Sequence, residues 1–267
     1  MDLKNLGLSG KTAIVTGASQ GGIGHAIASA LHAEGVALAL VSQSRRSAQA
    51  AAQTISAEAG DAPVYPIVAD LSLQAEVERV VVEAITRLGH VDILINSAAR
   101  AKTGAFFDMS DSDLQEIWQV KGMGYVRMTR AITPHMKQRG AGRIVNINGA
   151  AARTPAPEYL MVSMVNAALV NFTRGISRDL ARSHIRINSI SPDVTLTERM
   201  RRHIEMQAAA RRISFEAMLA IEAQSIPLGR LVTLDEIAAL ALYVVSDLCP
   251  SLTGEDIALD GGLTPGV

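Results

Sequence analysis

Thr16-Gly17-Ala18-Ser19-Gln20-Gly21-Gly22-Ile23-Gly24 is the stretch of sequence that decides the fold. It follows a short, β-branched apolar run at 11–16, which predicts a buried strand, and it opens a segment with apolar residues at helical spacing. Glycines at such a junction let the backbone approach a pyrophosphate, whose charge is met by the free N–H groups of the helix. The junction therefore predicts a nucleotide-binding loop; the alternative is an ordinary turn between a strand and a helix.

The composition is that of a globular protein with a large apolar core. Of 267 residues, 48% are hydrophobic and 3% aromatic, and the net charge is −1. So few aromatic residues argue against a stacking surface for single-stranded nucleic acid, and the charge gives no field that attracts DNA or an anionic membrane. We therefore expect neither nucleic acid nor a membrane as a partner.

The numbers and positions of the cysteine and histidine residues bear on disulfides, cellular location and metal binding. The single cysteine, Cys249, excludes an internal disulfide, and the N-terminus lacks the apolar core of a signal peptide, so we expect a cytoplasmic protein. The six histidines are scattered without ligand spacing. No metal site is predicted.

Short apolar runs alternate with longer amphipathic segments along the chain. The expected strands are 11–16, 36–41, 64–69, 91–95, 142–147, 185–190 and 256–259. The expected helices are 23–34, 45–59, 73–88, 111–138, 158–182, 198–223 and 234–246. This alternation predicts an α/β fold, a single doubly wound Rossmann-type parallel sheet of about seven strands with helices on both faces, spanning 1–267 as one domain. Ligands of such sheets bind at the carboxyl ends of the strands.

Motifs at these strand ends resemble those of the short-chain dehydrogenase/reductase family over nearly the whole chain. They are TGASQGGIG at 16–24, ADL at 69–71, DILIN at 92–96, GRIVN at 142–146, IRIN at 185–188, SP at 191–192, PLGR at 227–230, LTG at 252–254 and DGG at 260–262. The resemblance implies a nicotinamide dinucleotide cofactor, a small-molecule substrate, a homodimer or homotetramer, and a substrate lid at 197–225. It places the cofactor against Gly17, Ser19, Gln20, Gly22, Ile23, Gly24, Ser42, Arg45, Asp70, Leu71, Asn96, Ala98, Pro192 and Thr197.

Two of the motifs depart from the family pattern. The family loop is T-G-x-x-x-G-x-G, and this chain has one extra residue between Gly17 and Gly24, so either Gly21 or Gly22 fills the middle role. An added glycine is tolerated because positive φ stays available to it. The sequence NSAA stands at 96–99, where the family has N-N-A-G.

The residues after the second expected strand favour NADP(H), with NAD(H) left open. NAD enzymes place a carboxylate there for the adenosine ribose, but this chain has Ser42, followed closely by Arg45 and Arg46. A guanidinium could bind a 2′-phosphate; the alternative is that both arginines are the solvated start of a helix. Asp70 resembles the family's adenine-contacting acid, or it caps the helix that begins near Leu73.

None of the four residue types that family enzymes use for catalysis stands in its expected place. The family has a tyrosine that transfers the proton, a lysine four residues later, a serine that polarises the carbonyl, and an asparagine on the preceding helix. Alignment between GRIVN at 142–146 and AAL at 167–169 puts Val162, Asn166 and Gly149 at the first three positions, in that order. On the preceding helix, GY at 124–125 and TRA at 129–131 place Lys121 at the fourth.

The replacements suggest a permuted active site. Lysine and asparagine have exchanged places, and Tyr159 lies about one helical turn before Val162. We expect Tyr159 to be the acid/base, Lys121 to lower its pKa, and Asn166 to hydrogen-bond the ribose. The missing serine would be replaced by Asn148 or Ser163. The alternative is that Tyr159 packs over the cleft and the family chemistry has been lost.

The sequence thus predicts an NADP-dependent oxidoreductase that moves a hydride between the nicotinamide and a carbonyl or secondary alcohol of a small molecule. The absent tetrad leaves two rivals open. One is a non-redox enzyme on the same fold, a dehydratase, isomerase or decarboxylase. The other is a catalytically silent dinucleotide-binding protein.

Overall fold

The computed structural model describes residues 5–58, 60–100 and 102–264. Its centre is a seven-stranded sheet with the order β3-β2-β1-β4-β5-β6-β7, in which every neighbouring pair is parallel. The strands are β1 (Thr12–Thr16), β2 (Ala37–Ser42), β3 (Val64–Val68), β4 (Ile93–Asn96), β5 (Gly142–Ile147), β6 (Ile185–Pro192) and β7 (Asp256–Leu259). The predicted doubly wound sheet is confirmed, because the order reverses between β1 and β4.

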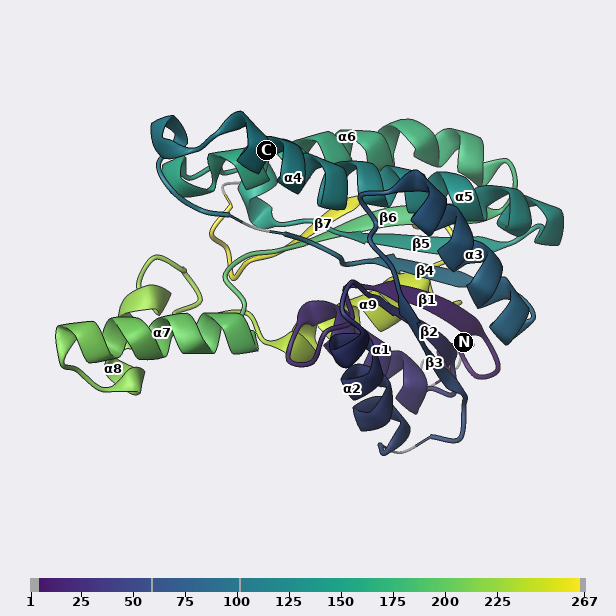
Figure 1. Cartoon of the computed structure of the whole chain (residues 1–267), viewed down its shortest axis with the longest axis horizontal. Coiled ribbons are helices and arrows are strands. Elements are labelled where there is room, and N and C mark those ends of the chain that lie inside the picture. The colour runs from purple at the N-terminus through teal and green to yellow at the C-terminus, as the bar shows by residue number, and fades with distance from the viewer. Residues whose placement is uncertain (1–4, 59, 101, 265–267) are drawn as a thin grey trace.

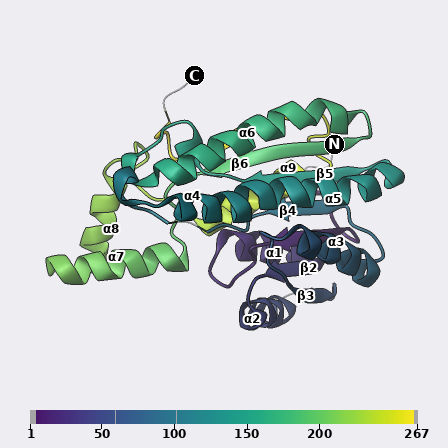
Figure 2. The same ribbon diagram turned by 45° about the horizontal axis from the view of Figure 1, so that its top comes forward.

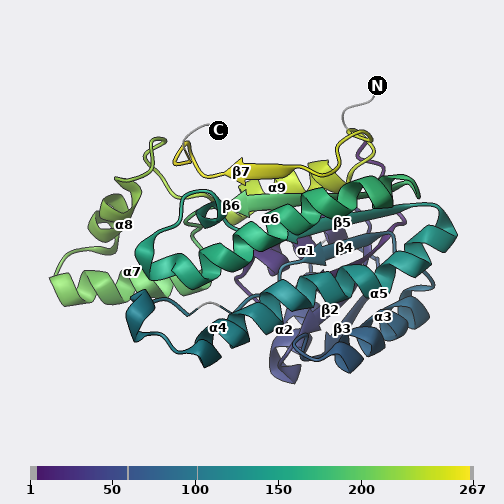
Figure 3. The same cartoon turned by 90° about the horizontal axis from the view of Figure 1, so that it is seen from above.

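Helices cover both faces of the sheet (Figure 1). One face carries α1 (Ile23–Ala33), α2 (Arg45–Ser56) and α9 (Leu234–Val245); the other carries α3 (Gln74–Leu88), α5 (Gly124–Arg139) and α6 (Leu160–Ala181). Each layer encloses its own apolar core, of which Ile27 and Ile237 are typical on the first face and Val80 and Ile132 on the second. Figure 3 shows the second layer from above, with α5 and α6 side by side.

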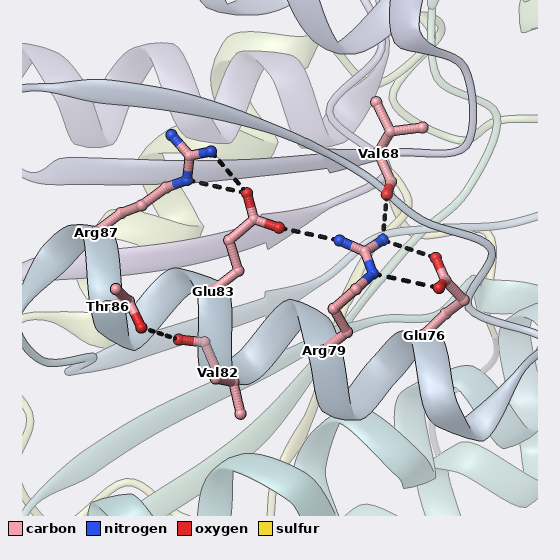
Figure 4. Close-up of polar contacts among 7 residues, drawn as sticks. All are labelled: Val68, Glu76, Arg79, Val82, Glu83, Thr86 and Arg87. Carbon is pink, nitrogen blue, oxygen red and sulfur yellow. Dashed lines mark hydrogen bonds and ion pairs between the residues drawn. The ribbon is translucent and has the colours of Figure 1, made fainter.

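Ion pairs along α3 run toward β3, as Figure 4 shows. Arg79 pairs with Glu76 and Glu83 at 2.7 and 2.9 Å and also donates to the carbonyl oxygen of Val68. Arg87 shares Glu83 at 2.8 Å. Exposed ion pairs of this kind add little to the stability of a fold.

Three expected helices differ from the observed ones. The segment 111–138 is divided into α4 (Asp111–Ile117), a π-helical turn (Trp118–Met123) and α5. The segment 158–182 begins as a 3₁₀ turn (Pro157–Tyr159) before α6. The segment 198–223 is two helices, α7 (Glu198–Arg211) and α8 (Phe215–Ala223), because Arg212 takes a left-handed conformation with φ of 55°.

Helices α7 and α8 project beyond the carboxyl ends of the strands (Figures 1 and 2). They enclose a small core of their own, which includes Ile204, Met218 and Ile226. This arrangement places the predicted lid, 197–225, next to the edge where the ligand is expected. Within the described part of the chain, no helix has the length and apolar character required to span a bilayer.

Candidate active site

Two glycines of the loop after β1 are fixed by close backbone contacts. Gly17 has φ of +67°, and a Cβ there would lie 2.6 Å from the backbone of Ala98. A Cβ at Gly24 would lie 2.6 Å from the carbonyl oxygen of Gly17. The loop after β1 therefore packs directly against the loop after β4, and only glycine fits at these two positions.

The extra residue of the loop joins the loop to α7. Gly21 has φ of +71°, and its carbonyl oxygen accepts the N–H of Glu198, the first residue of α7, at 3.1 Å. Gly22 is the N-cap of α1 and provides no side-chain cap, so the first N–H groups of that helix stay available to an anion. The two glycines thus have different roles: Gly22 opens the helix and Gly21 contacts α7.

Gly17→Ala is expected to destabilise the protein more than Gly140→Ala. Both residues have φ of +67°, so both alanines incur the left-handed penalty of about 1–2 kcal/mol, but a Cβ at Gly140 has open space around it. The difference between the two melting temperatures therefore measures the close approach of Gly17 to Ala98. Equal melting temperatures would contradict the close packing of these loops.

The adenosine end of the expected cofactor site contains no carboxylate directly after β2. Ser42 is buried, and its hydroxyl has no hydrogen-bond partner among the described residues. Arg45 and Arg46 are exposed at the start of α2, which is capped by Ser44. An orphaned hydroxyl and two guanidinium groups without partners among the described residues fit a ribose phosphate.

Asp70 does not cap α3, so that alternative is wrong. The N-cap is Leu73, and Asp70 instead accepts the N–H of Ser72 at 2.9 Å and a hydrogen bond from Gln43 at 3.1 Å. Burial raises the pKa of Asp70, but the hydrogen bonds from Ser72 and Gln43 and the charge of Arg100 outweigh it and lower that pKa. Asp70 is therefore a carboxylate at neutral pH.

Arg100 belongs to this end of the site and was missed from the sequence. Its guanidinium donates to Oε1 of Gln43 at 2.6 Å and pairs with Glu116 on α4. Gln43 in turn reaches Asp70, so one chain of contacts crosses the ends of β2, β3 and β4, beside a cavity of about 410 Å³. The position of Arg100 soon after β4 could have pointed to it, because residues that follow strands line such sites.

Lys121 lies buried at the carboxyl end of β5. It sits in the π-helical turn, its side chain is packed so that only 4% of the residue is exposed, and its Nζ donates to the carbonyl oxygen of Asn148 at 3.1 Å. Burial lowers the pKa of Lys121 to about 7. No carboxylate among the described residues pairs with it, and π-helical turns occur often at functional sites.

Tyr125 lies next to Lys121 and was also missed. Its ring centroid is 6.0 Å from the Nζ of Lys121, and its hydroxyl donates to the carbonyl oxygen of Ile147 at 3.0 Å. The two side chains therefore bond adjacent carbonyl groups at the end of β5. Complete burial raises the pKa of Tyr125 above its ordinary value. The spacing Lys-x-x-x-Tyr places both residues on one helix face, and this spacing could have indicated from the sequence that the two side chains are neighbours.

Tyr159 has a different environment from Tyr125. It ends the 3₁₀ turn before α6, is 49% exposed, and its hydroxyl makes no hydrogen bond with any described residue. Its carbonyl oxygen accepts the hydroxyl of Ser163 at 2.8 Å. Ser163 is thus engaged within its own helix, whereas the phenol of Tyr159 is free to meet a ligand.

A buried polar network supports the site from below. Asn96 bonds Asn146 at 2.9 Å, Asn146 bonds Thr173 at 3.0 Å, and Thr173 lies 2.9 Å from Ser189. Nδ2 of Asn148 donates to the hydroxyl of Ser189 at 3.0 Å, which connects the network to the carbonyl that holds Lys121. These hydrogen bonds fix the positions of the residues at the ends of β4, β5 and β6.

The remaining predicted cofactor residues lie at the same edge of the sheet. Ser19 accepts the N–H of Gly22, Thr197 caps α7, and Ala98 donates its N–H to Thr16. The rest line the ends of the first, third and sixth strands or the helices that follow: Gln20, Ile23, Leu71 and Pro192. No cluster of metal-ligating side chains occurs among the described residues.

Comparisons with known proteins show the family of the chain. Residues 17–264 match the family described as Enoyl-(Acyl carrier protein) reductase. The chain is 31% identical over 255 residues to the NADPH-dependent reductase BacG of Bacillus subtilis, covering 96% of this chain and 98% of BacG. The chain belongs to the short-chain dehydrogenase/reductase family.

Solved structures of two oxidoreductases show the same architecture. The L-sorbose reductase of Gluconobacter frateurii, complexed with NADPH and L-sorbose, has a TM-score of 0.93 at 26% identity and covers 98% of this chain and 100% of its own. An NAD⁺-bound xylitol dehydrogenase has a TM-score of 0.85 at 26% identity, with coverages of 96% and 99%. The expected family membership is confirmed, and the named relatives are oxidoreductases.

Proposed function

We propose that this short-chain dehydrogenase/reductase uses NADP(H) to interconvert a carbonyl and a secondary alcohol of a small molecule, as a homo-oligomer. The observation that carries the proposal is Lys121, a buried amine with a pKa of about 7 at the ligand-binding edge of the sheet. A group with a pKa near the working pH is effective both as a proton donor and as a proton acceptor. No purely structural need accounts for burying an unpaired lysine, which is unfavourable.

The residues present fit a dinucleotide. Gly17 and Gly24 leave room for close approach of a pyrophosphate, the N–H groups of α1 meet its charge, and the buried Ser42 hydroxyl is free to bond the adenosine ribose. When bound, NADPH supplies a hydride to the carbonyl carbon, so that the carbonyl is reduced to an alcohol, NADP⁺ forms and the oxygen takes up one proton.

The proton is delivered by residues of this chain. Tyr159 has a half-exposed hydroxyl without a hydrogen bond to any described residue and is the proposed acid, and Lys121 is the amine that replaces its proton. Tyr125 is the alternative acid, because it contacts Lys121 directly, although its hydroxyl bonds a backbone carbonyl. We propose that the carbonyl oxygen of Asn148 fixes the position of the Lys121 ammonium group by accepting its hydrogen bond.

The preference for NADP(H) rests on charge. No acidic residue follows β2 directly, while Arg45 is free and Arg100 reaches Gln43 beside the same strand. BacG is named as NADPH-dependent and the L-sorbose reductase was solved with NADPH, whereas the xylitol dehydrogenase holds NAD⁺. A charge-assisted hydrogen bond to the 2′-phosphate is worth about 1.5–3 kcal/mol, enough for a preference of tenfold or more.

The test measures NADPH and NADH binding by nicotinamide fluorescence and then NADPH oxidation against a panel of ketones and aldehydes. We expect tighter binding of NADPH, oxidation with at least one carbonyl, and about tenfold weaker NADPH binding in Arg45→Ala and in Arg100→Ala with NADH unchanged. Arg178→Ala, exposed on α6, is the matched control. Binding without oxidation would favour the non-redox or silent alternatives, and no binding of either dinucleotide would contradict the proposal.

A further inference from the structure

The side chain of Asn166 occupies the space next to Gly149, directly after β5. A Cβ built on Gly149 would lie 2.8 Å from Nδ2 of Asn166, closer than side chains approach. The backbone of Gly149 is extended, with φ of 174°, so its glycine is not required by conformation. The absence of a side chain at Gly149 therefore makes room for the amide of Asn166.

The two ends of this amide differ in environment. Asn166 is only 2% exposed, and its Oδ1 is completely buried without a hydrogen-bond partner among the described residues. Its Nδ2 is not among the completely buried orphan atoms, and no described residue accepts a hydrogen bond from it. The N–H groups are therefore available on the side of Gly149, which is the side of the site.

The other candidate donors in the neighbourhood are already engaged. Nδ2 of Asn148 donates to Ser189 at 3.0 Å, and the hydroxyl of Ser163 donates to the carbonyl oxygen of Tyr159 at 2.8 Å. Both were expected from the sequence to take the place of a missing serine. Among the three residues, Asn166 alone has a side-chain donor atom that makes no hydrogen bond within the described structure.

We propose that Nδ2–H of Asn166 donates the hydrogen bond that holds and polarises the substrate carbonyl oxygen. This inference rests on the proposed function and changes the sequence-based assignment, in which Asn166 bonded the ribose. The amide transfers no atom; it stabilises the negative charge that develops on the oxygen as the carbonyl carbon is attacked. Because Asn166 is buried on α6 with its amide against Gly149, its donor is already oriented before the substrate binds.

The experiment compares four variants: Asn166→Ala, Gly149→Ser, the double variant Gly149→Ser/Asn166→Ala, and the control Asn171→Ala, which is exposed on the same helix. Turnover with the best carbonyl of the panel, the NADPH dissociation constant and the melting temperature are measured for each. Asn166→Ala is expected to lower kcat roughly 10²–10³-fold, the effect of removing one oxyanion donor, with NADPH affinity nearly unchanged. Asn171→Ala should behave as wild type.

The double variant Gly149→Ser/Asn166→Ala tests the proposed donor most directly. Gly149→Ser alone forces a side chain into the amide of Asn166, so its melting temperature should fall, and Asn166→Ala in addition should restore it. The serine hydroxyl then stands in the vacated space, and we expect the double variant to recover about tenfold or more of the kcat lost in Asn166→Ala.

Three results would overturn the inference. The first is Asn166→Ala with unchanged kcat and more than about tenfold weaker NADPH binding, which would return Asn166 to the ribose. The second is a double variant that is stable but no more active than Asn166→Ala. The third is a wild type that oxidises no NADPH with any carbonyl; this would refute the proposed function itself, and with it this role of Asn166.

Discussion

Lys121→Met is expected to reduce carbonyl reduction roughly 10²–10⁴-fold, the range attributed to a positioned proton donor. Methionine has nearly the length of lysine, so the packing around Asn148 and Tyr125 is kept while the titrating amine is removed. Turnover and NADPH affinity are measured together, and affinity should change much less than turnover. Lys137→Met, exposed on α5, is the matched control. A Lys121→Met enzyme with wild-type turnover would exclude Lys121 from the chemistry.

The same substitution should stabilise the protein in a pH-dependent way. Burial lowers the pKa of Lys121 from 10.5 to about 7. Between these two pH values the unfolded chain binds more protons than the folded one, so this group opposes folding most strongly below about pH 7 and progressively less up to about pH 10.5. Lys121→Met should therefore raise the melting temperature at pH 6.5, and the gain should shrink toward pH 10. A loss of stability at pH 6.5 would contradict the unpaired burial of the amine.

Tyr159→Phe is the second substitution with a large expected effect, again roughly 10²–10⁴-fold in turnover. Only the hydroxyl of Tyr159 is removed, and no hydrogen bond to a described residue is lost with it, so the melting temperature should stay unchanged. Kinetics with saturating NADPH and the best carbonyl measure the effect.

Tyr125→Phe is the matched comparison. It removes a buried hydrogen bond to Ile147, so a loss of about 1 kcal/mol in stability is expected, with turnover retained. If Tyr125→Phe abolishes turnover while Tyr159→Phe leaves it intact, the acid is Tyr125 and the catalytic pair is Lys121 with Tyr125. If both variants keep wild-type rates, neither phenol transfers the proton.

The fold was predictable because its signals are local and repeated. Apolar runs such as 142–147 and 256–259 coincide with observed strands, and parallel strands joined by helices have few possible arrangements. The errors fall where tertiary contacts override helical spacing. The π-helical turn at Trp118–Met123 follows a helix that sequence periodicity extends without a break, and Arg212 takes a left-handed conformation that nothing in its side chain requires.

The site was predictable only in outline. Asn148 follows a strand, and Lys121 and Asn166 were found by alignment with the family's catalytic positions, but the contacts of these residues were not predicted. That Nδ2 of Asn148 is already bonded to Ser189 depends on a strand 41 residues away in the chain. The role of Arg100 likewise depends on Gln43, at a separation of 57 residues. Contacts between residues so far apart in the chain cannot be predicted from local sequence spacing.

The ionisation of Lys121 is the most direct test of the account. The chain contains five lysines, so lysine labelled with ¹³C at Cε gives few NMR signals, and Lys121→Met identifies one of them. We expect that signal to titrate with a midpoint near pH 7, well below the others, and ketone reduction to decline as pH rises through the same value because the protonated amine is consumed. A Lys121 signal that titrates together with the other lysines, above about pH 10, would show a solvated ammonium and contradict the account.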